Sequence, residues 1–255
     1  MKFTALAWLM FCGVAIADSR ITDPGARERA FVHALELFDA AKTPDDYRES
    51  AAELQSILAD GYRSGAAFYN LGNAYFRAGD YGQAILAYRK AKPYRPRDAY
   101  LTANLEQALA LAPGRLTETP RAWWTHVLFW SEWIAYPAKV QLAFAGSSLA
   151  AVCAALAFLW RRPRLYLVSI GLLLVSLAVA IDSVVNTEEL MFARHAVITG
   201  ETIARKGTGN SYEAAFDQPL RDGAEFMILQ ETPDWTFGHF AGVGDGWVRN
   251  EFVAK

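Results

Sequence analysis

Residues 68–96 read FYNLGNAYFRAGDYGQAILAYRKAKPYRP, and this stretch decides the fold of the N-terminal half. Apolar residues recur at helical spacing on both sides of the dipeptide Gly79-Asp80, which is typical of a turn. Gly72 and Ala84 are small, so two antiparallel helices can approach closely at these positions. The stretch therefore predicts a helical hairpin.

The same stretch resembles one unit of the tetratricopeptide repeat (TPR), a family of stacked helical hairpins. The signature positions of that unit are filled here by Leu71, Gly72, Tyr75, Gly79, Ala84, Tyr88, Ala91 and Pro96. The resemblance implies a clear repeat over residues 65–98. Because TPR arrays mostly bind other proteins, it also implies a binding role.

Residues 27–60 look like a degenerate copy of this unit. Residues 43–47 align with residues 77–81 at an offset of 34, the period of the repeat. In that alignment Phe38 stands where a glycine is expected, and Ser50 stands where an alanine is expected. We therefore expect a second helix pair with poorly kept small positions.

Residues 98–112 read as a single helix that covers the apolar end of the array, so the predicted TPR domain spans 18–112. TPR folds line their concave groove mainly with the first helix of each pair. The resemblance therefore implies a partner-binding groove made by Tyr69, Asn73, Phe76, Arg77 and Asn104. Asn73 can hydrogen-bond an extended peptide and Arg77 can hold a carboxylate; the alternative is that these are ordinary surface positions.

The composition excludes several classes of protein. The chain has 255 residues and a formal net charge of −2, which does not favour nucleic acid as a partner. Its two cysteines, Cys12 and Cys153, lie in apolar stretches and cannot build a disulfide framework. The four histidines are isolated, so we expect neither a metal site nor a cofactor.

Residues 1–17 have the features of a secretory signal peptide. Lys2 is followed by an apolar stretch and by the AIA sequence at 15–17, which is typical of a cleavage site. A lipoprotein signal ending at Cys12 and an uncleaved anchor are the alternatives. Phe11 disfavours lipidation because a small residue is needed before the modified cysteine.

Two further apolar stretches, 140–160 and 165–185, are long enough to cross a bilayer as helices. Arg161, Arg162 and Arg164 lie in the turn 161–164 between them. Basic residues beside spans mark the cytoplasmic side. We therefore expect a two-span protein of the bacterial inner membrane, with both larger domains in the periplasm.

The predicted spans carry small residues suited to close packing. Gly146, Ala150 and Ala154 form a stripe on the first span, and Ser169 and Ser176 lie on one face of the second. A simple anchor and a docking surface for another membrane protein both agree with this pattern. No charged residue lies mid-span, and Asp182 is expected at the membrane interface.

Residues 120–137 are rich in aromatic residues. The side chains Trp123, Trp124, Trp130 and Trp133 are grouped in this segment. Indole rings prefer the headgroup level of a bilayer. We therefore expect a helix that lies on the membrane surface and leads into the first span, and a sugar-binding platform is the alternative.

Residues 194–255 contain short strand-like stretches separated by turn residues, which predicts a small barrel. Residues 219–226 resemble the "pLreG-E" turn of bacterial SH3-like domains. Trp235, followed by the GWV sequence at 246–248, resembles their closing pattern. Trp235 and Trp247 then form either an exposed ligand platform or part of the core.

The order of the segments predicts a multidomain chain of all-α TPR hairpins, a two-helix transmembrane hairpin and a small all-β SH3-like barrel. The whole chain resembles the BatE-like TPR proteins of the bacterial aerotolerance operon family. The stretches that carry this resemblance are 69–75, 79–81, 123–124 and 246–248. It implies a complex with von Willebrand factor A-type membrane proteins and a link to envelope or oxidative stress.

Two functions therefore lead, and both are non-enzymatic. One is a membrane-anchored scaffold whose groove binds a partner protein. The other is a protein that binds peptidoglycan through its SH3-like domain. The chain has no nucleophile elbow, phosphate loop or paired metal ligands that would indicate an enzyme. A role in cytochrome assembly is a further alternative, against which the SH3-like tail argues.

Overall fold

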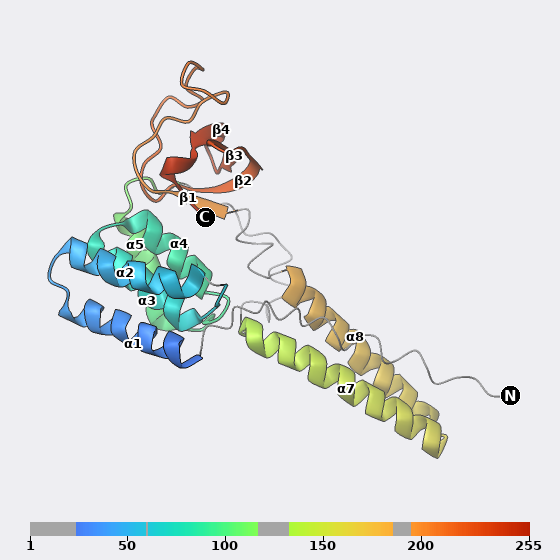
Figure 1. The fold of residues 1–255 in the computed structure, drawn as a ribbon. Helices are drawn as coiled ribbons and strands as arrows, with labels where there is room; N and C mark the ends of the chain where they lie inside the picture. Colours follow the sequence, from blue (N-terminus) through green and yellow to red (C-terminus); the bar gives the residue numbers. More distant parts are fainter. Residues whose placement is uncertain (1–23, 60, 117–132, 186–194) are drawn as a thin grey trace.

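A computed structural model of the chain describes residues 24–59, 61–116, 133–185 and 195–255. Five helices form an N-terminal helical domain, two long apolar helices form a hairpin, and an antiparallel sheet lies at the C-terminus (Figure 1). The helical elements are α1 (Pro24–Ala40), α2 (Pro44–Ala59), α3 (Gly65–Ala78), α4 (Tyr81–Ala91), α5 (Ala99–Leu111), α7 (Tyr136–Trp160) and α8 (Pro163–Val185). This architecture confirms the predicted order of a helical domain, an apolar hairpin and a β domain.

The ends of the helices follow from local hydrogen bonding. Ser64 caps α3 by accepting a hydrogen bond from the backbone N of Ala67 at 3.3 Å. Gly79 ends α3 in the left-handed conformation, with φ of 83°. The carboxylate of Asp98 caps α5 by accepting from the backbone N of Tyr100 at 2.9 Å and of Leu101 at 3.0 Å.

The pair α3–α4 packs around one close contact. A Cβ atom built on Gly72 would lie 2.5 Å from two ring carbons of Tyr88, so only glycine fits there. Tyr88 is fully buried at 0% exposure. Burial raises the pKa of Tyr88, and it raises the pKa of Tyr75 to about 12. The signature glycine therefore has a direct steric cause.

The pair α1–α2 corrects the predicted register of the degenerate repeat. The last residues of α1 and α3, Ala40 and Ala78, are 38 positions apart instead of 34. The residue 38 positions before Gly72 is Ala34, which is fully buried and accepts a hydrogen bond from the hydroxyl of Ser50 at 2.8 Å. Phe38 therefore does not replace a small residue, because Ala34 occupies the small position.

The C-terminal sheet has five strands in the order β4-β3-β2-β1-β5, with neighbouring strands antiparallel. The strands are β1 (His195–Ile198), β2 (Glu225–Glu231), β3 (Trp235–Phe240), β4 (Gly244–Arg249) and β5 (Val253–Ala254). The expected closed barrel is wrong in one respect: among the described strands, β4 and β5 are edges that do not pair with each other. Residues 202–206, one of the stretches expected to form a strand, form only isolated bridges at Thr202 and Arg205.

The sheet domain packs on the helical domain through α4. The backbone N of Gly82 donates to both carboxylate oxygens of Asp222, at 3.2 and 3.0 Å, and the guanidinium of Arg89 binds Glu225 through two hydrogen bonds. Val197 of β1 belongs to the core of the helical domain. Burial raises the pKa of Asp222. The two domains therefore form one unit, which the sequence did not predict.

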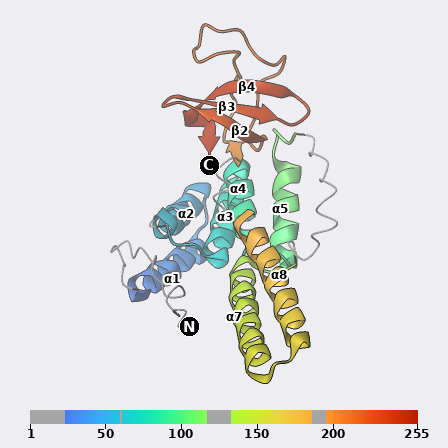
Figure 2. The same cartoon turned by 90° about the vertical axis from the view of Figure 1, so that its right-hand side faces the viewer.

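The helices α7 and α8 form an antiparallel hairpin that projects from the rest of the molecule (Figure 2). The predicted small-residue stripe lies between them: the hydroxyl of Ser169 donates to the backbone oxygen of Ala150 at 2.8 Å, and Gly146 lies directly against Ser176. Asp182, near the end of α8, is buried beside Lys139 with 2.9 Å between the charged atoms, and its expected place at the membrane interface stays a prediction. The ion pair takes both charges out of contact with the surroundings.

Candidate binding groove

A hollow of about 480 Å³ lies on the side of the helical domain formed by the first helix of each pair. Its walls come from α1, α3 and α5, with α4 behind them. The lining residues are Phe38, Asn73, Phe76, Arg77, Tyr88, Asn104 and Gln107. Four of the five predicted groove residues, Asn73, Phe76, Arg77 and Asn104, are therefore brought together at one surface.

A hydrogen-bond network forms the floor of this groove. The side-chain oxygen of Asn73 accepts from the hydroxyl of Tyr88 at 2.9 Å and from the amide of Asn104 at 3.0 Å. These two donors fix the orientation of the Asn73 amide. Its Nδ2 then has no hydrogen-bond partner within the described parts of the chain and can donate to a bound carbonyl group.

The rim of the groove combines apolar rings with one cation. Phe76 packs edge-on against Tyr81 with ring centroids 5.7 Å apart, and Phe38 packs in the same way against Tyr47 at 5.3 Å. Arg77 is exposed at the end of α3 and has no ion pair with any described residue. The arrangement offers an apolar contact, an amide donor and a positive charge within one hollow.

Tyr69 lies outside the lining of the groove. Its ring packs against the ring of Tyr88 at 6.1 Å and lies under the guanidinium of Arg95, at 4.6 Å from the ring centroid. Its hydroxyl accepts a hydrogen bond from Asn104 at 3.2 Å. Tyr69 therefore contacts two residues of the groove, Tyr88 and Asn104, and is not itself among the lining residues.

Sequence reasoning missed Phe38, Tyr88 and Gln107 as lining residues. The register of 34 residues assigned Phe38 to the contact between helices. The corrected register places it 38 positions before Phe76, on the groove side. Tyr88 is a signature position of the repeat, and its ring packs against Gly72 while its hydroxyl donates to Asn73 in the groove.

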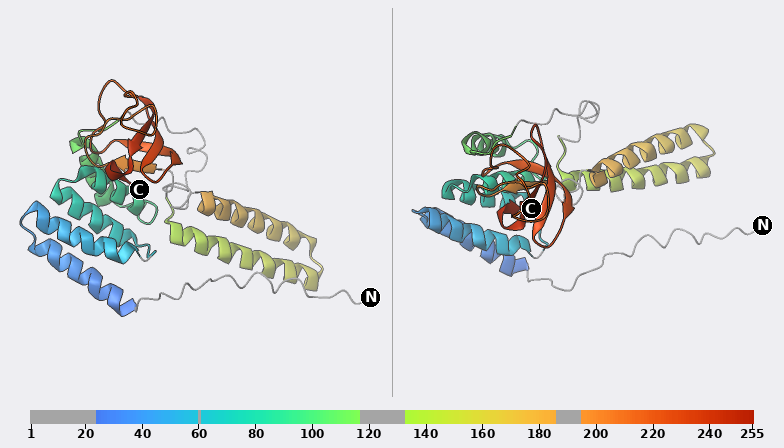
Figure 3. Two further views of the ribbon diagram at one scale, coloured as in Figure 1. Left: turned by 45° about the horizontal axis from the view of Figure 1, so that its top comes forward. Right: turned by 90° about the horizontal axis from the view of Figure 1, so that it is seen from above.

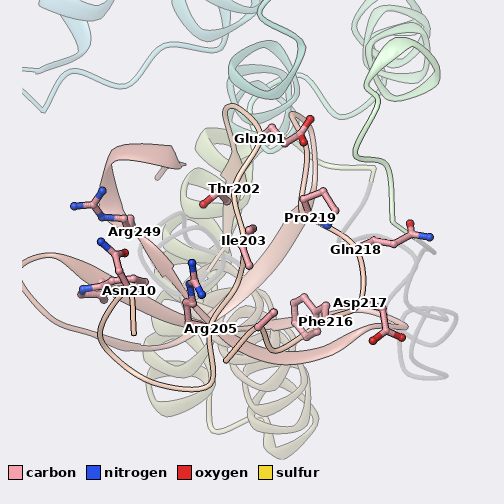
Figure 4. Close-up of a pocket in the computed structure, with 12 residues that line it drawn as sticks. Glu201, Thr202, Ile203, Arg205, Asn210, Phe216, Asp217, Gln218, Pro219 and Arg249 are labelled. Atoms are coloured by element: carbon pink, nitrogen blue, oxygen red, sulfur yellow. The ribbon is translucent and has the colours of Figure 1, made fainter. Parts of the chain in front are cut away.

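The sheet domain has a second hollow, of about 470 Å³, beside the long segment that joins β1 and β2 (Figure 4). Arg205 and Arg249 line it together with Glu201 and Asp217. Both arginines have internal partners: Arg205 donates to the backbone oxygen of Tyr212 at 2.9 Å, and Arg249 pairs with Glu251 at 2.7 Å. This hollow therefore has a lining of mixed charge in which both arginines make internal contacts.

Trp235 and Trp247 lie on the face of the sheet opposite the buried core. Trp235 lines the second hollow, and Trp247 packs against Phe237 with ring centroids 5.0 Å apart. The core on the other face is built around Phe226 and Phe240, whose rings stack at 4.6 Å. Both tryptophans are partly exposed and neither belongs to the core cluster, and the ligand platform stays a prediction.

The hairpin α7–α8 has the length and composition of a membrane-spanning pair. Its apolar side chains are exposed; Phe144 and Phe158 are 72% and 75% accessible. A core helix of a soluble domain would bury such residues. The turn with Arg161, Arg162 and Arg164 lies at the end of the hairpin far from both domains.

Only part of the aromatic segment at 120–137 can be compared with its prediction. Trp123, Trp124 and Trp130 lie outside the described residues, as do residues 1–17. Trp133 is in a turn before α7, not in the expected surface helix. Its ring lies 5.4 Å from the guanidinium of Arg97.

A comparison with protein families identifies the second helix pair. The family model of the tetratricopeptide repeat matches residues 65–98. Residues 65–98 are a TPR unit. A search of the curated proteins finds no match for the chain. The match covers α3 and α4 and supports protein–protein interaction as the general role of the helical domain.

The described residues contain no group of three histidine, cysteine, aspartate or glutamate side chains that could hold a metal ion. The lining of the groove itself offers hydrogen-bonding amides, one cation and aromatic rings.

Proposed function

We propose that this protein is a membrane-anchored scaffold whose TPR groove binds a segment of a partner protein. The observation that carries the proposal is the groove itself, where Asn73 and Arg77 line one hollow together with the rings of Phe38 and Phe76. An extended segment with a backbone carbonyl over Asn73, a carboxylate beside Arg77 and an apolar side chain against Phe38 and Phe76 matches this chemistry.

The anchor in this proposal is the α7–α8 hairpin, which spans the bacterial inner membrane. Its arginine-rich turn lies opposite both domains, which supports a cytoplasmic turn and a periplasmic location for the domains. The resemblance to BatE-like proteins makes von Willebrand factor A-type membrane proteins of the same operon the proposed partners. Tolerance of envelope or oxidative stress is the proposed context.

The C-terminal domain is proposed to be SH3-like. Five short antiparallel strands support this, with a long segment after β1 that returns to pair Arg205 with Trp247 on the edge of β4. The packing of this domain on α4 supports a second role, as a rigid cap on the last helix pair of the TPR domain.

A second candidate function is binding of peptidoglycan through the sheet domain. The partly exposed row of Trp235, Phe237 and Trp247 favours it, because aromatic faces stack on sugar rings. The two functions differ in the surface that they require. They can therefore be separated with the intact protein.

The test is site-specific photo-crosslinking of the full-length protein in native membranes. The crosslinking residue replaces Gln107, an exposed residue that lines the groove, and in a matched control it replaces Gln55, an exposed residue of α2 outside the groove. We expect one dominant protein adduct from position 107, none from position 55, and loss of the adduct when Arg77→Ala is added.

Equal labelling from both positions would contradict the groove proposal. If the same full-length protein were then retained on purified peptidoglycan, and Trp235→Ala/Trp247→Ala abolished that retention, the wall-binding function would replace it.

A further inference from the structure

A turn of the sheet domain lies between two helices of the helical domain. We call residues 221–223, which come just before β2, the wedge. Within the sheet domain the backbone N of Gly223 donates to the backbone oxygen of Ile198 at 2.8 Å, and the backbone N of Ala224 donates to that of Arg221 at 3.1 Å. Figure 3 shows the sheet domain lying against the end of the helical domain formed by α4 and α5.

The middle residue of the wedge, Asp222, is hydrogen-bonded to both of these helices. Its carboxylate oxygens accept from the backbone N of Gly82, in the first turn of α4, at 3.2 and 3.0 Å. Its backbone oxygen accepts from the backbone N of Gly114, just after the end of α5, at 2.8 Å. One residue of the sheet domain therefore connects the start of α4 to the end of α5.

The last residue of the wedge, Gly223, fills the space between the same two helices. A Cβ atom built on Gly223 would lie directly against the Cβ of Ala112, at the end of α5, and 3.4 Å from a side-chain carbon of Ile85 in α4. The φ of Gly223 is 90°, in the region that favours glycine. The separation of α4 and α5 at this end is therefore set by a turn that has no room for a side chain.

The helices α4 and α5 also supply the two donors in the floor of the groove. The hydroxyl of Tyr88 in α4 and the side-chain amide of Asn104 in α5 both donate to the side-chain oxygen of Asn73, at 2.9 and 3.0 Å. At their other end the two helices are joined by a hydrogen bond from Lys92 to Thr102 at 2.7 Å. The orientation of the Asn73 amide therefore depends on the separation of α4 and α5.

We propose that the wedge positions the groove for its partner. By fixing the separation of α4 and α5 it places Tyr88 and Asn104, which in turn orient Asn73. The wedge residues are not among those that line the groove, so Asp222 and Gly223 act as positioning residues. This inference rests on the proposed function and deepens it, because binding through the groove then requires the docked sheet domain.

The first test measures the position of α5 within the helical domain. Spin labels are attached to cysteines that replace Gln55 of α2 and Gln107 of α5, two exposed residues, in full-length protein whose native cysteines are replaced by serine. Double electron–electron resonance gives the distance between the labels. Gly223→Ala should shift it by about 1 Å, because the new Cβ must move away from Ala112 to reach ordinary contact.

The matched control is Gly244→Ala, also in the sheet domain. The φ of Gly244 is 129°, and its built Cβ lies 3.6 Å from a ring carbon of Phe216, which is ordinary contact. This change strains the backbone of the sheet domain without pressing on α4 or α5, so the label distance should stay that of the wild type. An equal shift in both variants would overturn the wedge.

A second-site variant tests the contact itself. Gly223→Ala/Ala112→Gly removes the Cβ that the new side chain meets and keeps the backbone strain at position 223. We expect the label distance to return to that of the wild type. A shift that persists in the double variant would overturn the wedge. If Gly223→Ala alone does not fold, a double variant that folds with the wild-type distance gives the same support.

The second test measures binding, with the photo-crosslinking residue at position 107 of the full-length protein in native membranes. Gly223→Ala should lower the yield of the adduct about five-fold, at the lower end of the coupling between separate sites. Gly244→Ala and the double variant should keep the wild-type yield. The melting temperature of each variant is measured as well. A yield that follows the melting temperature instead of the label distance would show a merely structural role and overturn the positioning role.

Failure of the wedge and failure of the proposed function can be told apart. If position 107 gives no adduct in the otherwise unaltered protein, the groove proposal is contradicted, and the label distances still test whether the wedge sets the position of α5. If the adduct forms and its yield is the same in Gly223→Ala, the positioning role is wrong and the groove proposal stands.

Discussion

In the pair α3–α4 the ring of Tyr88 lies against Gly72, whereas in the pair α1–α2 the hydroxyl of Ser50 lies against the backbone of Ala34. A glycine beside a large ring and an alanine beside a small hydroxyl both bring two helices close together. Only the first solution carries the signature of the TPR unit, and only that pair lies in the matched residues 65–98. The comparison shows that the close contact is shared while the residues that make it are not.

The largest effect is expected from Gly72→Val. The new side chain would overlap the ring of Tyr88, which is fully buried and cannot move aside. We expect a loss of about 3 kcal/mol in the free energy of unfolding, measured by denaturant titration of the full-length protein with far-UV circular dichroism. The matched control is Gly171→Val in α8, where no atom lies within 4 Å of the built Cβ.

If Gly171→Val were as destabilising as Gly72→Val, loss of glycine itself would be the cause. The steric account of the signature glycine would then be wrong.

The second-largest effect on stability is expected where α4 packs against the sheet domain. The pair α1–α2 does not make this contact. A Cβ on Gly82 would lie 2.6 Å from the backbone oxygen of Ile198 and 2.5 Å from a carboxylate oxygen of Asp222. We expect Gly82→Ala to cost about 2 kcal/mol and to loosen the contact between the domains. Hydrogen exchange should rise in β1 and stay unchanged in α1–α2; equal changes in both would contradict a local effect.

Two hydroxyl deletions compare the pairs directly. Tyr88→Phe removes the donor to Asn73, and Ser50→Ala removes the donor to the backbone oxygen of Ala34. Each hydrogen bond is expected to contribute about 1 kcal/mol, measured by the same denaturant titration. Tyr88→Phe should in addition weaken crosslinking from Gln107, because the floor of the groove loses its fixed orientation. An equal loss of crosslinking in Ser50→Ala would contradict the claim that the Tyr88–Asn73 hydrogen bond orients the floor of the groove.

Local patterns in the sequence were sufficient for the TPR unit and for the apolar hairpin. The turn at Gly79-Asp80 and the small residues Gly72 and Gly146 are local signals with one steric meaning each. Four groove residues followed from helical periodicity once the repeat was recognised. The boundaries of these segments differ from the observed helices by a few residues, as with α7, which begins at Tyr136.

Contacts between distant residues were not predictable in the same way. Gly82 and Asp222 are 140 positions apart, and no periodicity connects them. The predicted register of α1–α2 was wrong because residues 43–47 were aligned at an offset of 34 positions. The last residues of α1 and α3, Ala40 and Ala78, are 38 positions apart. The open sheet was missed because alternation of residues predicts strands but not which edges pair.

The smallest effect concerns the two turns. Asp46 accepts from the backbone N of Lys42 and of Thr43, at 2.9 and 2.8 Å, where the turn of the second pair has Gly79 instead. These donors, Lys42 first, hold the pKa of Asp46 below its ordinary value of 3.8. A lowered pKa adds stability above the pKa of the unfolded chain, and this stability is lost as the pH falls through the folded pKa.

Asp46→Asn should therefore melt below the wild type at neutral pH, and the gap should close as the pH falls below 3.8. Thermal melting of the full-length protein over a series of pH values measures it. Gly79→Ala is the matched change in the other turn. It strains a left-handed residue and alters no titrating group, so its difference from the wild type should not depend on pH. A gap for Asp46→Asn that stays constant with pH would show that the side chain acts by geometry, as Gly79 does, because a charge effect must disappear when the carboxylate is protonated.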